Sequence, residues 1–314
     1  MAFLTVGITY HNEGELLTSC IESFFSSAQK PDEVLVFDDA SSLRPEAFIP
    51  TGLPVRVIRS EENIGPGRGR NRLLNEAKGE WIHFHDADDW VFSDWLEKIK
   101  KEAHGETEVV LSELTSYREQ EVLSPLVIGL KAFQSKEELL KFAIKNFILV
   151  PSGTFKTELV RQIKGFRESL WQSEDWDFYI RLIQASRSFR ILDESLAGIR
   201  IRNESRSQIQ RETLTCVLQA ILFLQKEIDV QYRKDLADKA SWVGSKLFQL
   251  GDKASAREAF ALAESLGPAR HAHQKASYRW IAKYYGQESA EWFALFYRKV
   301  IPQKLRACLV HQVS

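Results

Sequence analysis

Apolar residues up to about Arg202 follow two spacings. Short apolar runs bounded by charged or turn-forming residues predict β-strands, and these runs are Phe3–Thr9, Glu33–Asp38, Val55–Arg59, Trp81–His85, Glu108–Ser112 and Phe189–Leu192. Between them, apolar residues recur at helical spacing, and one such stripe is Leu17, Cys20, Ile21, Phe24 and Phe25. Strands that alternate with helices predict an α/β domain with a mainly parallel sheet, in which ligands bind beyond the carboxyl ends of the strands.

The remainder of the chain has a different character. After about residue 207 the strand-like runs disappear, and Ala, Leu, Gln, Glu and Lys dominate. Gly251 and Gly286 separate helical segments at a spacing that a tetratricopeptide-like unit and an ordinary helical extension explain equally. We therefore predict two domains, an α/β domain at 1–207 and a helical C-terminal domain at 208–314. The aromatic residues expected in the core of the second are Trp242, Phe248, Phe260, Trp280, Tyr284 and Trp292.

The composition argues against some functional classes but does not identify one. The 314 residues carry a formal net charge of −1, so no overall field points to nucleic acid. Cys20, Cys216 and Cys308 stand apart among apolar residues, which argues against a disulfide or a zinc site. The N-terminal run lacks the features of a signal peptide, and no apolar stretch is long enough to span a bilayer. We expect a cytoplasmic protein with at most peripheral contact at the inner face of the membrane.

Three carboxylates crowd the end of the fourth predicted strand. The run Trp81–His85 is followed directly by Asp86-Ala87-Asp88-Asp89. Like charges this close repel, and burying them unpaired is expensive, so a cation is expected beside them. Mg²⁺ and Mn²⁺ prefer oxygen ligands and often bridge to phosphates. The cluster predicts a metal–diphosphate site at the carboxyl edge of the sheet, whereas packing explains His83 and His85 better than a metal role does.

Two further polar clusters follow the first two predicted strands. Thr9–Glu13 offers hydrogen-bonding groups and two flat rings that could sandwich a nucleobase, although the segment also suits a simple helix start. Asp38–Ser41 offers a carboxylate that could read a base N–H or ribose hydroxyls, although Asp and Ser are also ordinary turn caps. Neither cluster decides alone between a functional and a purely structural interpretation.

Two more clusters combine charge with glycine or with a helix start. Asn63–Asn71 contains glycines and arginines that could approach and neutralise phosphate, but it matches neither a Walker loop nor a Rossmann fingerprint. A solvated basic loop is the alternative. Ser173–Asp177 places three carboxylates at the start of a predicted helix, where they complement the helix dipole. One of them could instead act as a general base for an incoming hydroxyl.

In this order the clusters resemble the family 2 glycosyltransferases of the GT-A fold. The matching residues are Asp38-Asp39-Ala40-Ser41, Arg70-Asn71, Gly79-Glu80, Asp86-Ala87-Asp88-Asp89, Gly165-Phe166-Arg167-Glu168 and Glu174-Asp175, within roughly residues 1–207. The resemblance implies a Rossmann-like, mainly parallel sheet flanked by helices. It also implies transfer of a sugar from a nucleotide-diphosphate donor, UDP being favoured, to a hydroxyl acceptor, with inversion at the anomeric carbon.

The resemblance also implies roles for individual residues. Those expected around the nucleotide are Thr9, His11, Glu13, Asp39 and Arg70, with His11 where relatives often have Tyr. Asp86 and Asp88 match the family's Asp-x-Asp motif at the donor diphosphate, so Asp88 is the expected direct ligand of Mn²⁺ or Mg²⁺, with Asp86 and Asp89 beside it. Asp175 matches the catalytic base, and Glu174 is the alternative. Trp171 and Trp176 could stack on an acceptor sugar, although Trp176 suits helix packing equally well.

One position departs from the family pattern. Many relatives carry a His soon after the last strand, in a Tyr-Arg-x-His segment, as a further metal or phosphate ligand. The matching stretch here is Ile199-Arg200-Ile201-Arg202. Arginine cannot bind a metal but can bind a diphosphate directly. We hypothesise that Arg202 binds the diphosphate and supplies part of the charge neutralisation, and that metal dependence is therefore weaker than usual.

Three other functions fit the sequence less well. A sugar nucleotidyltransferase normally opens with a glycine-rich loop after the first strand, and a phosphatase with an Asp nucleophile places Asp-x-Asp there, but Thr9–Glu13 has neither feature. A non-catalytic sugar-nucleotide-binding scaffold would not need Asp86, Asp88 and Asp175 together.

The acceptor stays open among a polysaccharide, a lipid-linked oligosaccharide and a protein. Trp292–Arg306 mixes aromatic and basic residues, which suits either a packed helix or an interfacial helix on anionic lipid.

Overall fold

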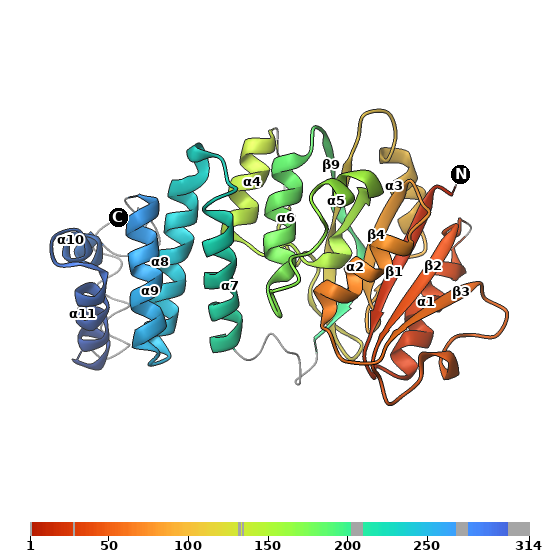
Figure 1. Cartoon of the computed structure of the whole chain (residues 1–314), viewed down its shortest axis with the longest axis horizontal. Helices are drawn as coiled ribbons and strands as arrows, with labels where there is room; N and C mark the ends of the chain where they lie inside the picture. Colours follow the sequence, from red (N-terminus) through yellow and green to blue (C-terminus); the bar gives the residue numbers. More distant parts are fainter. Residues whose placement is uncertain are drawn as a thin grey trace. The chain divides into compact units, whose positions relative to one another are not determined.

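The chain forms two compact units, Met1–Ile209 and Gln210–Ser314. The computed structural model describes residues 2–27, 29–130, 133, 135–201, 210–267 and 276–300 (Figure 1). The strands of the first unit are β1 (Leu4–Tyr10), β2 (Glu33–Asp39), β3 (Val55–Ser60), β4 (Trp81–Asp86), β5 (Trp90–Val91), β6 (Val109–Arg118), β7 (Glu121–Ser124), β8 (Gly153–Lys156) and β9 (Phe189–Arg200).

The strands join in one sheet in the order β3-β2-β1-β4-β8-β6-β9-β5, with β7 attached to β6. The predicted parallel arrangement holds for β3, β2, β1 and β4. Beyond β4 the sheet becomes mixed, because β8 runs antiparallel to both of its neighbours. All six predicted strands are present. β6 and β9 run further than predicted, since they pair with each other through polar residues that interrupt their apolar runs.

The register of the parallel strands brings three polar clusters to one edge of the sheet. Thr9 on β1 lies opposite Asp86 on β4, and Tyr10 lies opposite Asp38 on β2. The carboxyl ends of parallel strands always share an edge. The clusters that follow the first, second and fourth predicted strands are therefore neighbours in space.

Helices cover both faces of this sheet. In the first unit they are α1 (Glu15–Ser26), α2 (Pro66–Glu76), α3 (Trp95–Glu102), α4 (Lys136–Lys145), α5 (Thr157–Gln162) and α6 (Glu174–Ala185). On one face, Phe24 of α1 packs edge-on against His85, with ring centroids 5.1 Å apart. On the other, Phe84 of β4 packs against Phe166 at 5.2 Å, and Phe166 stacks on Phe178 of α6 at 4.1 Å. Alternation along β4 thus sends its histidines under α1 and its phenylalanine under α6.

The described part of the second unit is helical. Its helices are α7 (Gln210–Leu224), α8 (Arg233–Gln249), α9 (Lys253–Leu266), α10 (Ala276–Tyr285) and α11 (Gln287–Val300). Gly251 between α8 and α9 and Gly286 between α10 and α11 have φ of 84° and 83°, a left-handed conformation that glycine adopts at little cost. Two helical hairpins result. Their relation to tetratricopeptide units stays a prediction, and among the described residues no helix is long and apolar enough to cross a membrane.

Of the six aromatic residues expected in the core of this unit, two are buried, three are exposed and Trp242 is part-buried. Phe248 and Phe260 are buried, at 2% and 5% exposure. Trp280, Tyr284 and Trp292 are instead exposed, at 56%, 60% and 49%. Aromatic composition alone does not identify the buried face of a helix, and α10 buries Tyr278 while its other rings point outward.

Candidate active site

The ends of β1 and β4 and the middle of α2 meet at one carboxylate. Thr9 Oγ1 donates to Asp86 Oδ1 at 3.1 Å, as the pairing of the two strands requires. Arg70 of α2 reaches the same oxygen through Nη2, at 2.7 Å. The structure thus brings Thr9, Arg70 and Asp86 together, and their roles toward a ligand stay predictions.

Arg70 also joins this strand end to the start of α6. Its Nη1 donates to Glu174 Oε1 at 2.7 Å, and its guanidinium lies 5.3 Å from the centre of the Phe166 ring. The residue is 3% exposed, and its Nε finds no hydrogen-bond partner among the described residues. Burial alone would lower the pKa of Arg70, but the charges of Asp86 and Glu174 raise it above its usual range. Arg70 is therefore a permanent cation between two carboxylates.

The three carboxylates at the end of β4 have different surroundings. Burial alone would raise the pKa of Asp86, but the charge and hydrogen bond of Arg70 outweigh it and hold the pKa below its usual value. Burial, together with the charges of Asp88 and Asp86, raises the pKa of Asp89 well above its usual value. Asp89 Oδ1 accepts from the Arg200 backbone N–H at 2.8 Å, and the Asp88 main-chain oxygen accepts from Arg200 Nε at 2.7 Å. Asp89 is buried, whereas Asp86 and Asp88 are part-exposed.

This donor set fits a hard divalent cation whose coordination a substrate completes. Carboxylate oxygens are the ligands that Mg²⁺ and Mn²⁺ prefer. Within the residues that the structure describes, no three His, Cys, Asp or Glu side chains are grouped so that they could hold a metal ion. Two part-exposed carboxylates are nevertheless sufficient where phosphates and water supply the other ligands. Arg202, the predicted partner of the diphosphate, lies outside the described residues.

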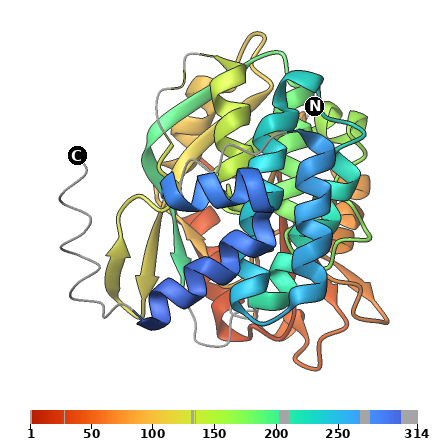
Figure 2. The ribbon, with the colours of Figure 1, turned by 90° about the vertical axis from the view of Figure 1, so that its left-hand side faces the viewer.

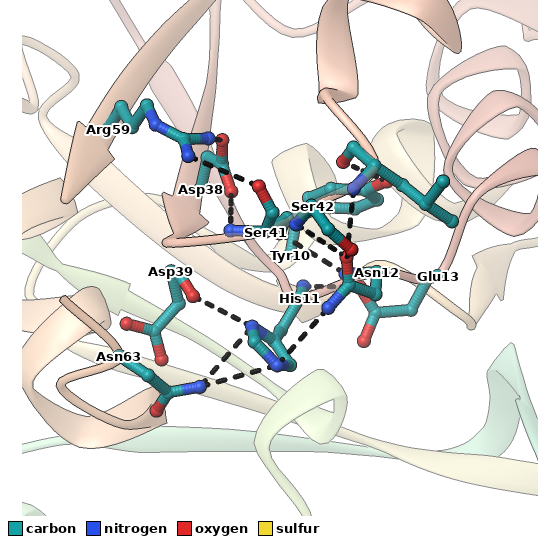
Figure 3. A network of polar contacts seen from close by, with 11 residues as sticks. Tyr10, His11, Asn12, Glu13, Asp38, Asp39, Ser41, Ser42, Arg59 and Asn63 are labelled. Atoms are coloured by element: carbon teal, nitrogen blue, oxygen red, sulfur yellow. Dashed lines mark hydrogen bonds and ion pairs between the residues drawn. The ribbon is translucent and has the colours of Figure 1, made fainter. Parts of the chain in front are cut away.

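A polar network ties the end of β1 to the loops after β2 and β3 (Figure 3). His11 Nδ1 lies 2.7 Å from the Asp39 main-chain oxygen and 3.3 Å from Asn63 Nδ2, and the His11 backbone N–H donates to the Glu13 carboxylate. Asn12 has a φ of 67°, and its Oδ1 accepts from the backbone of Ser42 and Leu43 at 2.9 and 3.0 Å. The His11 ring therefore sits where the three segments converge.

Asp39 is already engaged by backbone groups. Its Oδ1 accepts from the N–H of Ile64 at 2.7 Å, and its Oδ2 accepts from the N–H of Gly65 at 2.9 Å. The carboxylate thus holds the loop that leads into α2. Each oxygen keeps a second acceptor position, so contact with a base stays chemically feasible. The neighbouring Asp38 is fully buried and pairs with Arg59, which gives it a structural place.

The start of α6 holds a carboxyl group with a raised pKa. Asp175 Oδ1 accepts from the backbone N–H of Trp176 at 2.8 Å. Burial, followed by the charge of Glu174, raises the pKa of Asp175 to about 7, against the lowering effect of Arg70. A carboxyl group that titrates near neutral pH is suited to proton transfer. The third acid of this cluster, Asp177, is fully buried and pairs with Arg167 and Arg181, so it stabilises the fold.

The two tryptophans near this helix occupy different environments. Trp176 is 1% exposed, and its indole N–H donates to the Ile144 main-chain oxygen at 3.3 Å, so it is a packing residue. Trp171 is 47% exposed. A Cβ on Gly65 would lie 3.0 Å from the Trp171 ring, which means that the indole covers the loop held by Asp39. Trp171 thus remains as the exposed flat surface near Asp175.

The histidines of β4 are buried packing residues, although the charge of Asp86 acts on His85, which directly precedes it. His83 Nε2 lies 3.1 Å from His85 Nδ1, and both rings are fully buried under α1 and α3. Burial lowers the pKa of His83 well below its usual value and that of His85 to about 4. Both rings are therefore neutral at physiological pH.

Two residues of this edge were missed by sequence reasoning. Arg200 holds Asp88 and Asp89 from β9, and its guanidinium lies 4.8 Å from the centre of the Trp90 ring. The predicted strand ended at Leu192, so nothing placed Arg200 beside the acids. Asn12 holds the loop after β2, a role that the sequence did not predict. Its signal is its place in the turn after β1, because Asn adopts the left-handed conformation more readily than most residues.

The fold and the acidic strand edge define a glycosyltransferase of the GT-A type. The chain belongs to Glycosyl transferase family 2, whose model matches residues 5–163. It is 29% identical over 218 residues to an uncharacterised glycosyltransferase of Methanocaldococcus jannaschii, covering 66% of this chain and 73% of the relative. It is 26% identical over 198 residues to a teichoic acid poly(glycerol phosphate) polymerase of Staphylococcus epidermidis, covering 59% of this chain and 26% of that protein.

Solved structures share the fold at low sequence identity. Residues 1–349 of TarS from S. aureus, in complex with UDP-GlcNAc, superpose with a TM-score of 0.71 at 18% identity, covering 95% of this chain and 92% of that one. The mannosyltransferase PcManGT of Pyrobaculum calidifontis, in complex with GDP-Man and Mn²⁺, gives a TM-score of 0.56 at 16% identity, with 95% and 87% covered. These likenesses establish the architecture of the chain.

Replacing Arg70 tests how strongly the first unit depends on its central cation. Arg70→Ala leaves Asp86 and Glu174 without a counter-charge, so we expect the free energy of unfolding to fall by about 3–5 kcal/mol at neutral pH. The loss should shrink as the pH is lowered, because Asp86, whose pKa is no longer held down by Arg70, then becomes neutral in the variant. Chemical denaturation over a pH series measures both effects.

The matched control is Arg56→Ala. Arg56 also lies 2.7 Å from a carboxylate, that of Glu76, but it is 44% exposed, so we expect a loss below about 1 kcal/mol. If the two variants lost the same free energy of unfolding, the first unit would depend on Arg70 no more than on an exposed ion pair.

Proposed function

We propose that the chain is an inverting glycosyltransferase that moves a sugar from a nucleotide-diphosphate sugar, UDP-linked by preference, to a hydroxyl group of a glycan or glycoconjugate. The observation that carries the proposal is that Arg70 bonds both Asp86, at the acidic end of β4, and Glu174, the neighbour of Asp175 on α6. The pKa of Asp175 is raised to about 7. Inversion requires a base on one face of the sugar and stabilisation of the leaving group on the other. Relatives of the fold that hold UDP-GlcNAc and GDP-Man support a nucleotide-sugar donor.

In this proposal Asp175 is the general base. As the acceptor oxygen bonds to the anomeric carbon, its proton passes to the Asp175 carboxylate, and the nucleotide diphosphate leaves with the electrons of the broken bond. Glu174 is the alternative base, but its Oε1 is occupied by Arg70 at 2.7 Å. Glu174 would therefore act mainly by keeping the pKa of Asp175 high.

The leaving diphosphate would be received at the end of β4. Asp88 and Asp86 are the proposed ligands of Mn²⁺ or Mg²⁺, and a bound divalent ion supplies charge stabilisation to the departing diphosphate. The Mn²⁺ held by PcManGT supports a divalent ion of this kind. Asp89 and Arg200 would fix the backbone around Asp88. Arg202 stays the proposed direct partner of the diphosphate.

The nucleoside would lie beside the network in Figure 3. Thr9, His11 and Glu13 are the proposed lining, and His11 offers the flat face for a base. We propose that Asp39 acts in part indirectly, because it positions the backbone of Ile64 and Gly65 that a ligand would meet. Trp171 is the proposed platform for an acceptor sugar, and a polysaccharide acceptor is supported by the teichoic acid polymerase among the relatives. The second unit is proposed as a helical accessory domain.

The alternative is a scaffold that binds a nucleotide sugar without turning it over. The transferase and the scaffold are distinguished by measuring, with Mn²⁺ present, whether the protein releases free nucleotide diphosphate from a series of donors. Thermal shift identifies donors for this series, because a ligand that binds only the native state raises its melting temperature. Donors that stabilise the protein but are never turned over with any acceptor would favour the scaffold.

Two isosteric variants separate the roles of the acids on α6. Asp175→Asn should lower kcat by about two to four orders of magnitude, because the amide cannot take up the proton. Glu174→Gln should keep most of the activity and move the acidic limb of the pH profile of kcat/KM to lower pH, because it removes a charge that raises the pKa of Asp175. In the wild type that limb should fall as the pH drops through about 7. Loss of activity in Glu174→Gln with retention in Asp175→Asn would assign the base to Glu174.

A second test concerns the proposed metal ligand. Asp88→Asn should raise the Mn²⁺ concentration needed for half-maximal binding by on the order of tenfold, since one anionic ligand is lost. Equilibrium binding followed by electron paramagnetic resonance measures this without turnover. Asp94→Asn, on an acid of the next segment that pairs with Lys98 at 2.7 Å, is the matched control and should not change the Mn²⁺ affinity. An unchanged affinity in Asp88→Asn would exclude Asp88 as a ligand.

A third test concerns Trp171. Trp171→Ala should raise the KM for the acceptor by on the order of tenfold while donor hydrolysis without acceptor stays unchanged, because only the acceptor would stack on the indole. Trp171→Phe should restore much of the acceptor affinity. A change in the KM for the donor alone would place the ring in the donor pocket instead.

A further inference from the structure

The outer helices of the second unit expose an unusual number of aromatic side chains. Of the fifteen exposed large apolar residues of the described chain, six lie on α10 and α11. They are Trp280, Tyr284, Tyr285, Trp292, Phe293 and Phe296, each at least 41% exposed. We call these residues the aromatic face. Figure 2 shows α10 and α11, in dark blue, lying side by side.

The rings of α10 form a cluster of their own. The Trp280 ring lies 5.4 Å from that of Tyr284 and 5.8 Å from that of Tyr285. On α11, Trp292, Phe293 and Phe296 follow the spacing of one side of a helix. Single exposed apolar residues are normal, but six exposed rings on two helices that pack against each other mark a surface that binds something. None of these rings takes part in the proposed catalytic chemistry.

The charges around the aromatic face are positive. Arg279 and Lys283 on α10 and Lys299 on α11 are exposed, and Lys283 Nζ lies 5.2 Å from the centre of the Tyr284 ring. α10 contains no Asp or Glu. On α11, Glu288 pairs with Arg257 at 2.8 Å. The other acid of α11, Glu291, is fully buried and accepts from the Tyr278 hydroxyl at 2.7 Å. Among the described residues of these two helices, an anionic partner therefore meets no exposed carboxylate that lacks a cationic partner.

We propose that the aromatic face docks on the surface of an anionic phospholipid bilayer. Trp and Tyr favour the headgroup level, where one side of the ring is wet and the other apolar, while Lys and Arg pair with lipid phosphates. A neutral glycan is a poorer match, because its hydroxyls are read by carboxylates and amides as well as by rings. The exposed residues of α10 offer cations instead. This proposal is independent of the proposed transferase chemistry.

The test is co-sedimentation of the full chain with vesicles. Phosphatidylglycerol–phosphatidylcholine vesicles should retain the protein at low salt, and pure phosphatidylcholine vesicles should retain much less. Since each basic residue near an anionic surface contributes roughly a fivefold gain in partitioning, Arg279→Glu/Lys283→Glu should weaken binding by more than about tenfold. Trp280→Ser/Tyr284→Ser/Tyr285→Ser should also weaken it strongly. All the changed side chains are exposed, and circular dichroism checks that the variants fold.

The matched control removes exposed apolar groups elsewhere in the same unit. Leu222→Ser/Val230→Ser changes side chains that are 46% and 74% exposed, and binding to the anionic vesicles should stay within twofold of the wild type, roughly the effect of a surface substitution. Equal binding to neutral and anionic vesicles, or no effect of the variants on α10, would overturn the proposal. So would sedimentation velocity showing an oligomer that the triple variant abolishes, since the face would then join copies of the chain. Retention on a neutral polysaccharide, lost in the triple variant and not matched by vesicles, would assign the face to a glycan.

Discussion

A single buried guanidinium holds the two sides of the candidate active site together. Arg70 bonds Asp86 at the end of β4 and Glu174 at the start of α6, each at 2.7 Å, with almost no exposure to water. The carboxylates gathered at this edge would repel one another without it, and Asp86 in particular stays ionised because of it. Since β4 and α6 are about ninety residues apart in the sequence, this contact fixes a distance that no local structure could set.

The glycines around Arg70 serve packing more than ligand contact. A Cβ on Gly69 would lie 2.6 Å from the Phe37 ring, and one on Gly67 would lie 3.3 Å from the Glu174 side chain. Pro66 begins α2, where its missing N–H costs nothing. α2 can therefore approach both β2 and α6 closely enough for Arg70 to reach two partners. The glycines of segment 63–71 were expected to let the backbone approach a ligand, and a side chain at Gly67 or Gly69 would meet protein side chains.

The sequence was sufficient wherever a property was local. Buried strands ending in acids predicted the edge formed by β1, β2 and β4, because the carboxyl ends of parallel strands must coincide. It was insufficient where a property depended on contacts between distant segments. Both oxygens of Asp39 are taken by the backbone of Ile64 and Gly65, and Arg200 reaches Asp88 and Asp89 from a strand whose extension depends on pairing with β6. The prediction that Trp280 and Tyr284 are buried was wrong for the same reason. The neighbouring helices decide which side of α10 is buried.

The adjacency of Glu174 and Asp175 acquires a physical explanation from Arg70. Two neighbouring carboxylates at one helix start would both resist ionisation in a partly buried place. The Arg70 guanidinium bonds Glu174 directly, and the charge of Glu174 acts on the neighbouring Asp175. Burial and this charge raise the pKa of Asp175, the more distant effect of Arg70 lowers it, and the balance falls at about 7. A proton acceptor poised near neutral pH thus arises from burial and the charge of Glu174, and Arg70, which bonds Glu174, also bonds Asp86 at the end of β4.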